Sequence, residues 1–153
     1  MMAEKENYDA SDKLGPAIRA LIPSSLDDVI RFHREHFQLR LTSEEEIFDL
    51  YKAIMPSEPK DIIDDWNLIT LQKTDGHFIW LLGEVRSKGC PRMTSDVTGI
   101  DLKNGFLKTR SGSLYQLGNL KNGPPTQEEL YLVCATFHTW GFGAGLGVPH
   151  FFY

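Results

Sequence analysis

The side chains of this sequence that could carry out chemistry are few, and the most suggestive pair lies near the C-terminal end. Cys134 and His138 are four positions apart, a spacing that places a thiol and an imidazole on one face of a helix. Such a pair could bind a metal or form a thiolate–imidazole couple, with His150 or Cys90 supplying a third group. Because this spacing is also common on the buried face of a helix, we favour a packing role for both residues.

Histidine and aspartate clusters elsewhere in the chain give weaker signals. His33 and His36 are three positions apart but lack an obvious third ligand, so a solvated basic face is the simpler interpretation. Asp61, Asp64 and Asp65 could attract a cation or a sugar, but their pattern is more typical of an exposed helix end. The chain contains no nucleophile-elbow, zinc-protease, phosphate-loop or kinase motif. We therefore expect no metal site and no cofactor.

Hydroxyl groups concentrate in one short segment, 109–113, with the sequence T-R-S-G-S. It could cradle an anion, with Arg110 as the donor. The simpler interpretation is a turn in which the serine side chains bond the local backbone and Gly112 supplies a positive φ. Arg110 and Arg92 could also form a basic patch on one face of a sheet, which is the one place where we would look for nucleic acid. The lysines that would join this patch are Lys88, Lys103 and Lys108.

The last residues, 140–153, are apolar and carry glycine at alternate positions from 141 to 147. They do not match G-x-G-x-x-G, follow no predicted strand and open no helix, so a phosphate-binding loop is not predicted. The tail either packs on the core, where glycine allows close approach to a neighbouring backbone, or contacts a partner or a second copy of the chain. The partner-binding candidates are therefore Phe142, Leu146, Phe151, Phe152 and Tyr153, together with Arg92 and Arg110 on the sheet.

Length and composition favour one soluble domain over residues 1–153, with 41% hydrophobic and 24% charged residues. No apolar run approaches the ~20 residues needed to cross a bilayer, and the first residues lack a secretory core. Two cysteines are too few for a disulfide framework. A formal net charge of -5 disfavours general nucleic-acid binding. We expect a cytoplasmic protein that has no membrane segment.

Capping patterns, apolar periods and turn signals predict an α+β domain. Helices are expected where a capping pattern precedes a period of three to four residues, and strands where short apolar runs alternate with turn signals such as Asp75-Gly76. Gly83, inside one strand, predicts a bulge or a close backbone approach. The capping patterns are Ser25 with Asp28, Ser43 with Glu46, and Thr126 with Glu129.

The predicted order of elements follows from these signals. A loose tail over 1–15 precedes two N-terminal helices within 24–56, with one more helical turn near Asp61–Asp65. A five-stranded antiparallel meander or small barrel occupies 67–119, one C-terminal helix occupies 127–139, and the Gly-rich tail follows over 140–153.

Part of the predicted meander resembles a segment that recurs in small uncharacterised bacterial and phage proteins. The run from Thr94 to Asp101 begins T-S and ends I-D, and the run from Thr109 to Gly118 has the form T-x-S-G-S-x-Y-x-L-G. The resemblance implies a prokaryotic or phage setting and a small β unit, and it implies no activity.

The function that these observations favour is non-enzymatic binding of a protein partner, as in an inhibitor, an immunity or anti-defence protein, or a regulatory accessory protein. Association of two copies through the C-terminal tail stays open. The alternative is a small-ligand-binding protein or enzyme that uses the Arg110–Ser113 turn with Cys134, His138 or His150.

Overall fold

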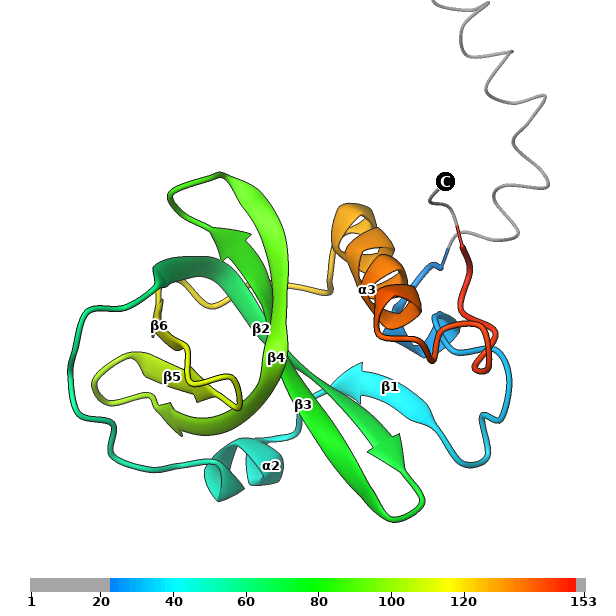
Figure 1. The fold of residues 1–153 in the computed structure, drawn as a ribbon, viewed down its shortest axis with the longest axis horizontal. Helices are drawn as coiled ribbons and strands as arrows, with labels where there is room; N and C mark the ends of the chain where they lie inside the picture. Colours follow the sequence, from blue (N-terminus) through cyan, green and yellow to red (C-terminus); the bar gives the residue numbers. More distant parts are fainter. Residues whose placement is uncertain (1–22, 151–153) are drawn as a thin grey trace, which may run out of the picture.

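The computed structural model describes residues 23–150 and combines one mixed sheet with few helices (Figure 1). The order of elements is as follows: 3-10 helix η1, Leu26–Asp28; β1, Gln38–Leu41; α2, Glu44–Asp49; β2, Asp61–Lys73; β3, Gly76–Val85; β4, Cys90–Asp101; β5, Phe106–Thr109; β6, Leu114–Leu117; and α3, Gln127–Thr139. The residues expected to form a loose tail, 1–15, lie outside the described part of the chain.

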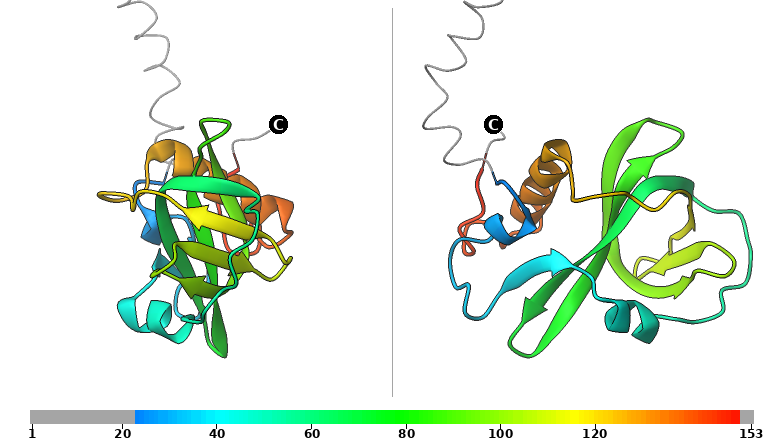
Figure 2. Two further views of the ribbon diagram at one scale, coloured as in Figure 1. Left: turned by 90° about the vertical axis from the view of Figure 1, so that its left-hand side faces the viewer. Right: turned by 180° about the vertical axis from the view of Figure 1, so that it is seen from behind.

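The six strands form one sheet in the order β1-β2-β3-β4-β5-β6, and β6 pairs back onto β2. From β2 to β6 each strand is antiparallel to the next one, so β6 must run parallel to β2. Accordingly β6 pairs in parallel with the start of β2, from Asp61 opposite Tyr115 to Ile63 opposite Leu117. The closed end of the sheet faces the viewer in the left view of Figure 2.

Strand β2 is long enough to pair with two different strands along the same edge. Its first part pairs with β6 and its last part with β1, and a register irregularity between Asp64 and Asn67 separates the two parts. Gly83 on β3 faces this irregularity. A Cβ there would lie 2.5 Å from Ile63 Cγ2 and 2.9 Å from the Asp64 carbonyl oxygen, so the predicted close approach is confirmed.

Two hydrophobic cores lie on opposite faces of β2 and β3. Successive side chains on a strand point to opposite faces, so Leu68 belongs to the core inside the closed sheet while Ile69 belongs to the core under α3. Both faces are therefore apolar, which explains the uninterrupted run from Ile79 to Leu82. Figure 1 shows α3 covering the open part of the sheet, away from the β5–β6 end.

The predicted fold class is wrong at the N-terminal side. In place of the first of the two helices predicted within 24–56, the chain after Ser25 has a three-residue 3-10 turn and then irregular structure, with His33 at a φ of 59°. The Ser25 side chain forms no capping hydrogen bond with the backbone of this turn. The backbone N–H groups of Arg31 and Phe32 donate instead to the Leu146 carbonyl, so tertiary bonds replace helical ones.

The sheet also differs from the five strands that were predicted. The residues Gln38–Leu41 form the additional strand β1, so the sheet has six strands. The residues Asp61–Asp65, for which a helical turn was predicted, form the beginning of β2. The hairpin turn between β2 and β3 is Thr74-Asp75, because Lys73 pairs with Gly76. Strand β1 was not predicted because it is only four residues long, too short for an alternation of apolar and polar residues to be recognised in the sequence.

The second N-terminal helix is present but short. The capping box of Ser43 and Glu46 is formed as predicted, yet α2 ends at Asp49 and buries none of its residues. The chain then joins the edge of β4, where Lys52 N–H donates to the Ile100 carbonyl. The expected helix up to position 56 is therefore replaced by an extended segment.

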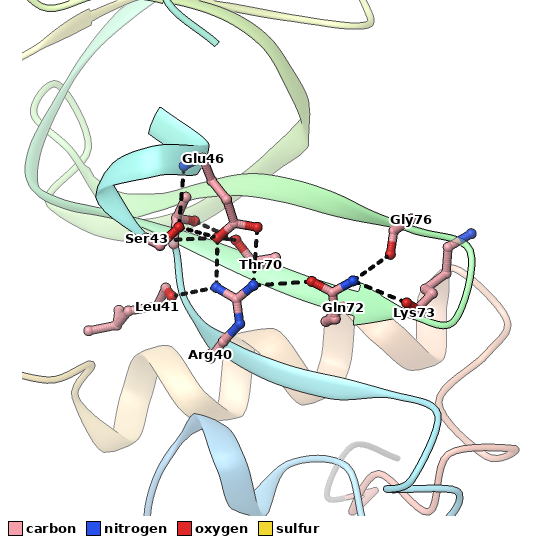
Figure 3. A network of polar contacts seen from close by, with 9 residues as sticks. Arg40, Leu41, Ser43, Glu46, Thr70, Gln72, Lys73 and Gly76 are labelled. Atoms are coloured by element: carbon pink, nitrogen blue, oxygen red, sulfur yellow. Dashed lines mark hydrogen bonds and ion pairs between the residues drawn. The ribbon is translucent and has the colours of Figure 1, made fainter. Parts of the chain in front are cut away.

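A polar network fastens α2 to the sheet (Figure 3). Arg40 on β1 donates twice to the Glu46 carboxylate, at 2.6 and 3.1 Å, and once to the Gln72 side chain at 3.1 Å. The buried Thr70 hydroxyl lies 3.3 Å from the same carboxylate. The hydrogen bond from Arg40 lowers the pKa of Glu46 to about 2, so this carboxylate is ionised at neutral pH.

Candidate functional site

The candidate site begins on β3, where two aromatic residues share one face. Phe78 and Trp80 are two positions apart, so both point toward the α3 side of the sheet, and their rings stack with centroids 5.8 Å apart. Trp80 is buried, packed 5.5 Å from the Phe137 ring of α3. Phe78 lies further along the hairpin and is 38% exposed.

The end of α3 supplies the opposite wall. Trp140 is the C-cap residue, and its indole lies 5.3 Å from that of Trp80 while remaining 41% exposed. Gly141 follows with a φ of 93°, a conformation that glycine adopts without strain, and the chain reverses there. Phe142 then packs 4.8 Å from Phe137.

The glycine-rich segment after α3 is a compact series of turns. Leu146 N–H donates to the Phe142 carbonyl, and Val148 N–H donates to the Gly143 carbonyl. Gly143 has no space for a side chain, because a Cβ there would lie 2.8 Å from Cγ of the His138 ring. The ring nitrogen Nε2 of His138 lies 2.8 Å from the Val148 carbonyl oxygen and donates to it.

Two adjoining hollows run between these walls, and we call them together the aromatic groove. The first, of about 380 Å³, is lined by Phe78, Trp80, Ser95, Asp96, Trp140 and Phe142. The second, of about 370 Å³, shares Phe78 and Phe142 and adds Phe37, Leu71, Lys73, Gly141, Gly145 and Leu146. The two hollows therefore adjoin at the side chains of Phe78 and Phe142, and most of their lining is apolar.

Charged groups stand at both ends of the aromatic groove. The ammonium group of Lys73 lies 4.6 Å from the centroid of the Phe78 ring. At the other end, Arg110 Nε donates to Asp96 Oδ2 at 2.7 Å, and the arginine side chain is 71% exposed. The groove therefore combines an aromatic floor with charged rims.

The structure brings only some of the partner-binding candidates to this groove. Phe142 forms part of its wall, and Arg110 stands at its rim through Asp96. Leu146 also lines the second hollow, but it is buried in the core under α3. Arg92 points elsewhere, with its guanidinium 6.0 Å from the Tyr115 ring. The remaining candidates, Phe151, Phe152 and Tyr153, lie outside the described residues.

The hydroxyl-rich segment 109–113 forms a turn between β5 and β6. Gly112 has a φ of 87° and donates its N–H to the Thr109 carbonyl. The Ser111 hydroxyl lies 3.0 Å from that of Thr109 and 3.3 Å from that of Ser113. The predicted turn with a positive φ at Gly112 is therefore confirmed, but its serine hydroxyls bond other hydroxyl groups and not the local backbone as predicted.

The thiol and imidazole groups near the C-terminal end play packing roles in this structure. Cys134 is fully buried, and burial raises the pKa of its thiol to about 12, so it stays protonated at neutral pH. The His138 ring is stacked on His150 at 4.4 Å and bonded to Val148. Within residues 23–150, no three histidine, cysteine or carboxylate side chains converge to hold a metal ion.

Among the groove residues that sequence reasoning missed, Phe78, Trp80 and Trp140 matter most. The first two could have been recognised as an aromatic pair on one face of a predicted strand. The place of Trp140 depends on how the end of α3 meets β3, which no local pattern specifies.

Comparisons with models of protein families, with curated proteins and with solved structures found no match. None of the helices in the described range has the length and apolar character needed to cross a membrane.

Proposed function

We propose that this chain is a non-enzymatic binding protein of the cytoplasm that acts on a protein partner through the aromatic groove. The class proposed for this chain is that of an inhibitor, an immunity or anti-defence protein, or a regulatory accessory protein of bacterial or phage type. The observation that carries the proposal is the aromatic groove between Phe78 and Trp140, whose rings are partly exposed although both contact the buried Trp80.

The chemistry of the groove supports a protein segment as its occupant. An apolar centre that is rich in aromatic side chains, surrounded by a polar rim, is the typical composition of a protein interface. Apolar area removed from water contributes about 25 cal/mol per Å², and each large aromatic ring offers some 150–250 Å². The partner that fits is a segment presenting two or more large apolar side chains, one for each hollow.

The groove is also held in place before any partner arrives. Its floor includes the buried Trp80, which packs on the buried Phe137, and its wall follows a helix end that is closed by Gly141. A surface fixed in this way loses little conformational entropy on binding, so more of the contact energy is expressed as affinity. Trp140 and Phe78 are the residues expected to contribute most.

The experiment that tests this function selects binding peptides from a random library displayed on phage, using the folded chain as bait. Selected peptides should be rich in aromatic and aliphatic residues and should lose at least about tenfold in affinity, or about 1.4 kcal/mol, on the Trp140→Ser and Phe78→Ser variants. The Phe48→Ser variant is the matched control, because Phe48 is 74% exposed and lies outside the groove.

Two results would contradict the proposal. One is a selection that yields no binding peptide at all. The other is a set of peptides that bind the Trp140→Ser and Phe78→Ser variants as tightly as the unchanged chain. Circular dichroism of each variant shows that it is folded before its affinity is compared.

A further inference from the structure

A separate hollow lies on the β4–β5 side of the molecule, under the extended segment that joins α2 to β2. This segment is held at both ends, because Lys52 N–H donates to the Ile100 carbonyl and Lys60 N–H donates to the Leu114 carbonyl. The hollow beneath it has a volume of about 390 Å³. Its lining includes Lys52, Ile54, Met55, Ser57, Lys108 and Leu114.

The position of Lys52 depends on a glycine of β4. A Cβ at Gly99 would lie 2.8 Å from Cδ and 2.9 Å from Cγ of Lys52, so the lysine side chain occupies the space that a side chain at 99 would need. The backbone itself does not require glycine there, since the φ of Gly99 is outside the positive region. Gly99 therefore serves to let Lys52 lie flat across β4.

Lys108 reaches the same hollow from the neighbouring strand. It is the residue of β5 that pairs directly with Gly99, so the lysine lying over Gly99 and the lysine opposite it are neighbours. Within the described residues, the structure shows no ion pair for the ammonium group of Lys52 or of Lys108. Two neighbouring cations in a concave surface produce a positive local potential although the whole chain carries a net charge of -5.

We propose that this hollow binds a small organic anion, a phosphate monoester or a carboxylate with a compact apolar part. Lys52 and Lys108 bind the anionic oxygens, and the Ser57 hydroxyl is an additional donor in the lining. Ile54 and Leu114 provide the apolar wall. The site is independent of the aromatic groove, since it uses none of the groove residues and a different class of ligand.

The test is a titration of the isotope-labelled full chain followed by amide NMR. Phenyl phosphate and benzoate are the two organic anions, inorganic phosphate lacks the apolar part, and phenol lacks the charge. Saturable shifts should appear at the amides of Ala53, Gly99 and Gly112 with phenyl phosphate, benzoate or both, and they identify which anion is preferred. Phenol should leave these amides unchanged, and inorganic phosphate should bind more weakly than phenyl phosphate.

Variants separate a specific site from general attraction of anions. Lys52→Gln and Lys108→Gln should each weaken binding at least about threefold, and raising the ionic strength from about 0.02 to about 0.2 M should weaken it further. Lys88→Gln, which removes the same charge from the β3–β4 turn, should bind as the unchanged chain does. Gly99→Ala should weaken binding without changing the charge, because the new Cβ displaces Lys52.

Three results would overturn the proposal. The first is the absence of saturable shifts with either organic anion. The second is equal affinity in the Lys52→Gln, Lys108→Gln and unchanged chains. The third is a response to phenol as large as the response to phenyl phosphate, since the hollow would then be an apolar site only. The amide spectrum of each variant without ligand verifies that it is folded.

Discussion

The indole rings of Trp80 and Trp140 lie 5.3 Å apart, centroid to centroid, with an angle of 44° between their planes. One ring belongs to the middle of strand β3 and the other to the end of helix α3, so this contact joins the floor of the aromatic groove to the wall at the end of α3. Trp80 is 4% exposed and Trp140 41%. The buried ring thus fixes the position of the exposed one, which is the arrangement expected of a binding surface that exists before its partner.

Replacing Gly83 by alanine should destabilise the fold by about 1–3 kcal/mol. The added Cβ would meet the Asp64 carbonyl oxygen at 2.9 Å and the Trp66 Cα at 3.1 Å, and backbone atoms cannot move aside cheaply. Urea denaturation measures the change. Gly145→Ala is the control, because the nearest atom to a Cβ there is the Phe142 carbonyl oxygen at 3.8 Å. Equal stability of the two variants would contradict the close approach of β2 and β3.

Replacing Glu46 by glutamine should cost about 1.5–3 kcal/mol at neutral pH, since a charge-assisted pair with Arg40 is lost. The pKa of Glu46 in the fold is about 2, below its ordinary value of 4.5. The carboxylate therefore stabilises the fold fully above pH 4.5 and loses this contribution as the pH falls toward 2.

Thermal or urea unfolding across this pH range measures the effect of the Glu46→Gln substitution. The difference in unfolding free energy between the unchanged chain and Glu46→Gln should shrink steadily from pH 5 to pH 2. A difference that does not depend on pH would show that the carboxylate charge contributes nothing to the attachment of α2.

Alkylation of the native chain at pH 8 should modify Cys90 and leave Cys134 unmodified. Cys90 is exposed, whereas Cys134 is buried and its thiol pKa is raised to about 12 by burial. Mass spectrometry after a short treatment with iodoacetamide distinguishes the two. Both cysteines should react once the chain is denatured. Rapid modification of Cys134 in the native chain would contradict its place in the core and would revive a role for it in chemistry.

Shortening Leu146 to alanine should destabilise the fold by about 2–5 kcal/mol, the range for large-to-small changes in a core. Leu146 is 7% exposed, and its carbonyl accepts the N–H groups of Arg31 and Phe32. Phe32→Ala, which removes a side chain that is 57% exposed, should cost less. If Leu146→Ala unfolds at the same urea concentration as the unchanged chain, then the glycine-rich segment is not part of the core.

Local signals predicted the elements that are held together by local bonds. Helix α3 occupies Gln127–Thr139 because Thr126 and Glu129 form a capping box and an apolar face follows with helical spacing. Strands β5 and β6 lie within the meander predicted for 67–119, on either side of the predicted turn at Gly112. In both cases the residues that determine the structure are within a few positions of one another.

The segments whose structure was predicted wrongly are those whose hydrogen-bond partners lie far along the chain. The apolar spacing after Ser25 fits a helix, but the Leu146 carbonyl accepts the N–H groups that a helix would use. The parallel pairing of β2 with β6 and the addition of β1 likewise depend on partners far along the chain. The aromatic groove has the same origin, because β3 and the segment after α3 meet only in the folded molecule.

The most direct test of the central claim observes the indole N–H signals of the three tryptophans during titration with a selected peptide. Trp140 lines the groove, whereas Trp66 belongs to the core inside the closed sheet and donates its indole N–H to the Gly118 carbonyl. Binding in the groove should shift the Trp140 signal and leave the Trp66 signal unchanged. A titration that saturates with the Trp140 signal unmoved would contradict the proposed function.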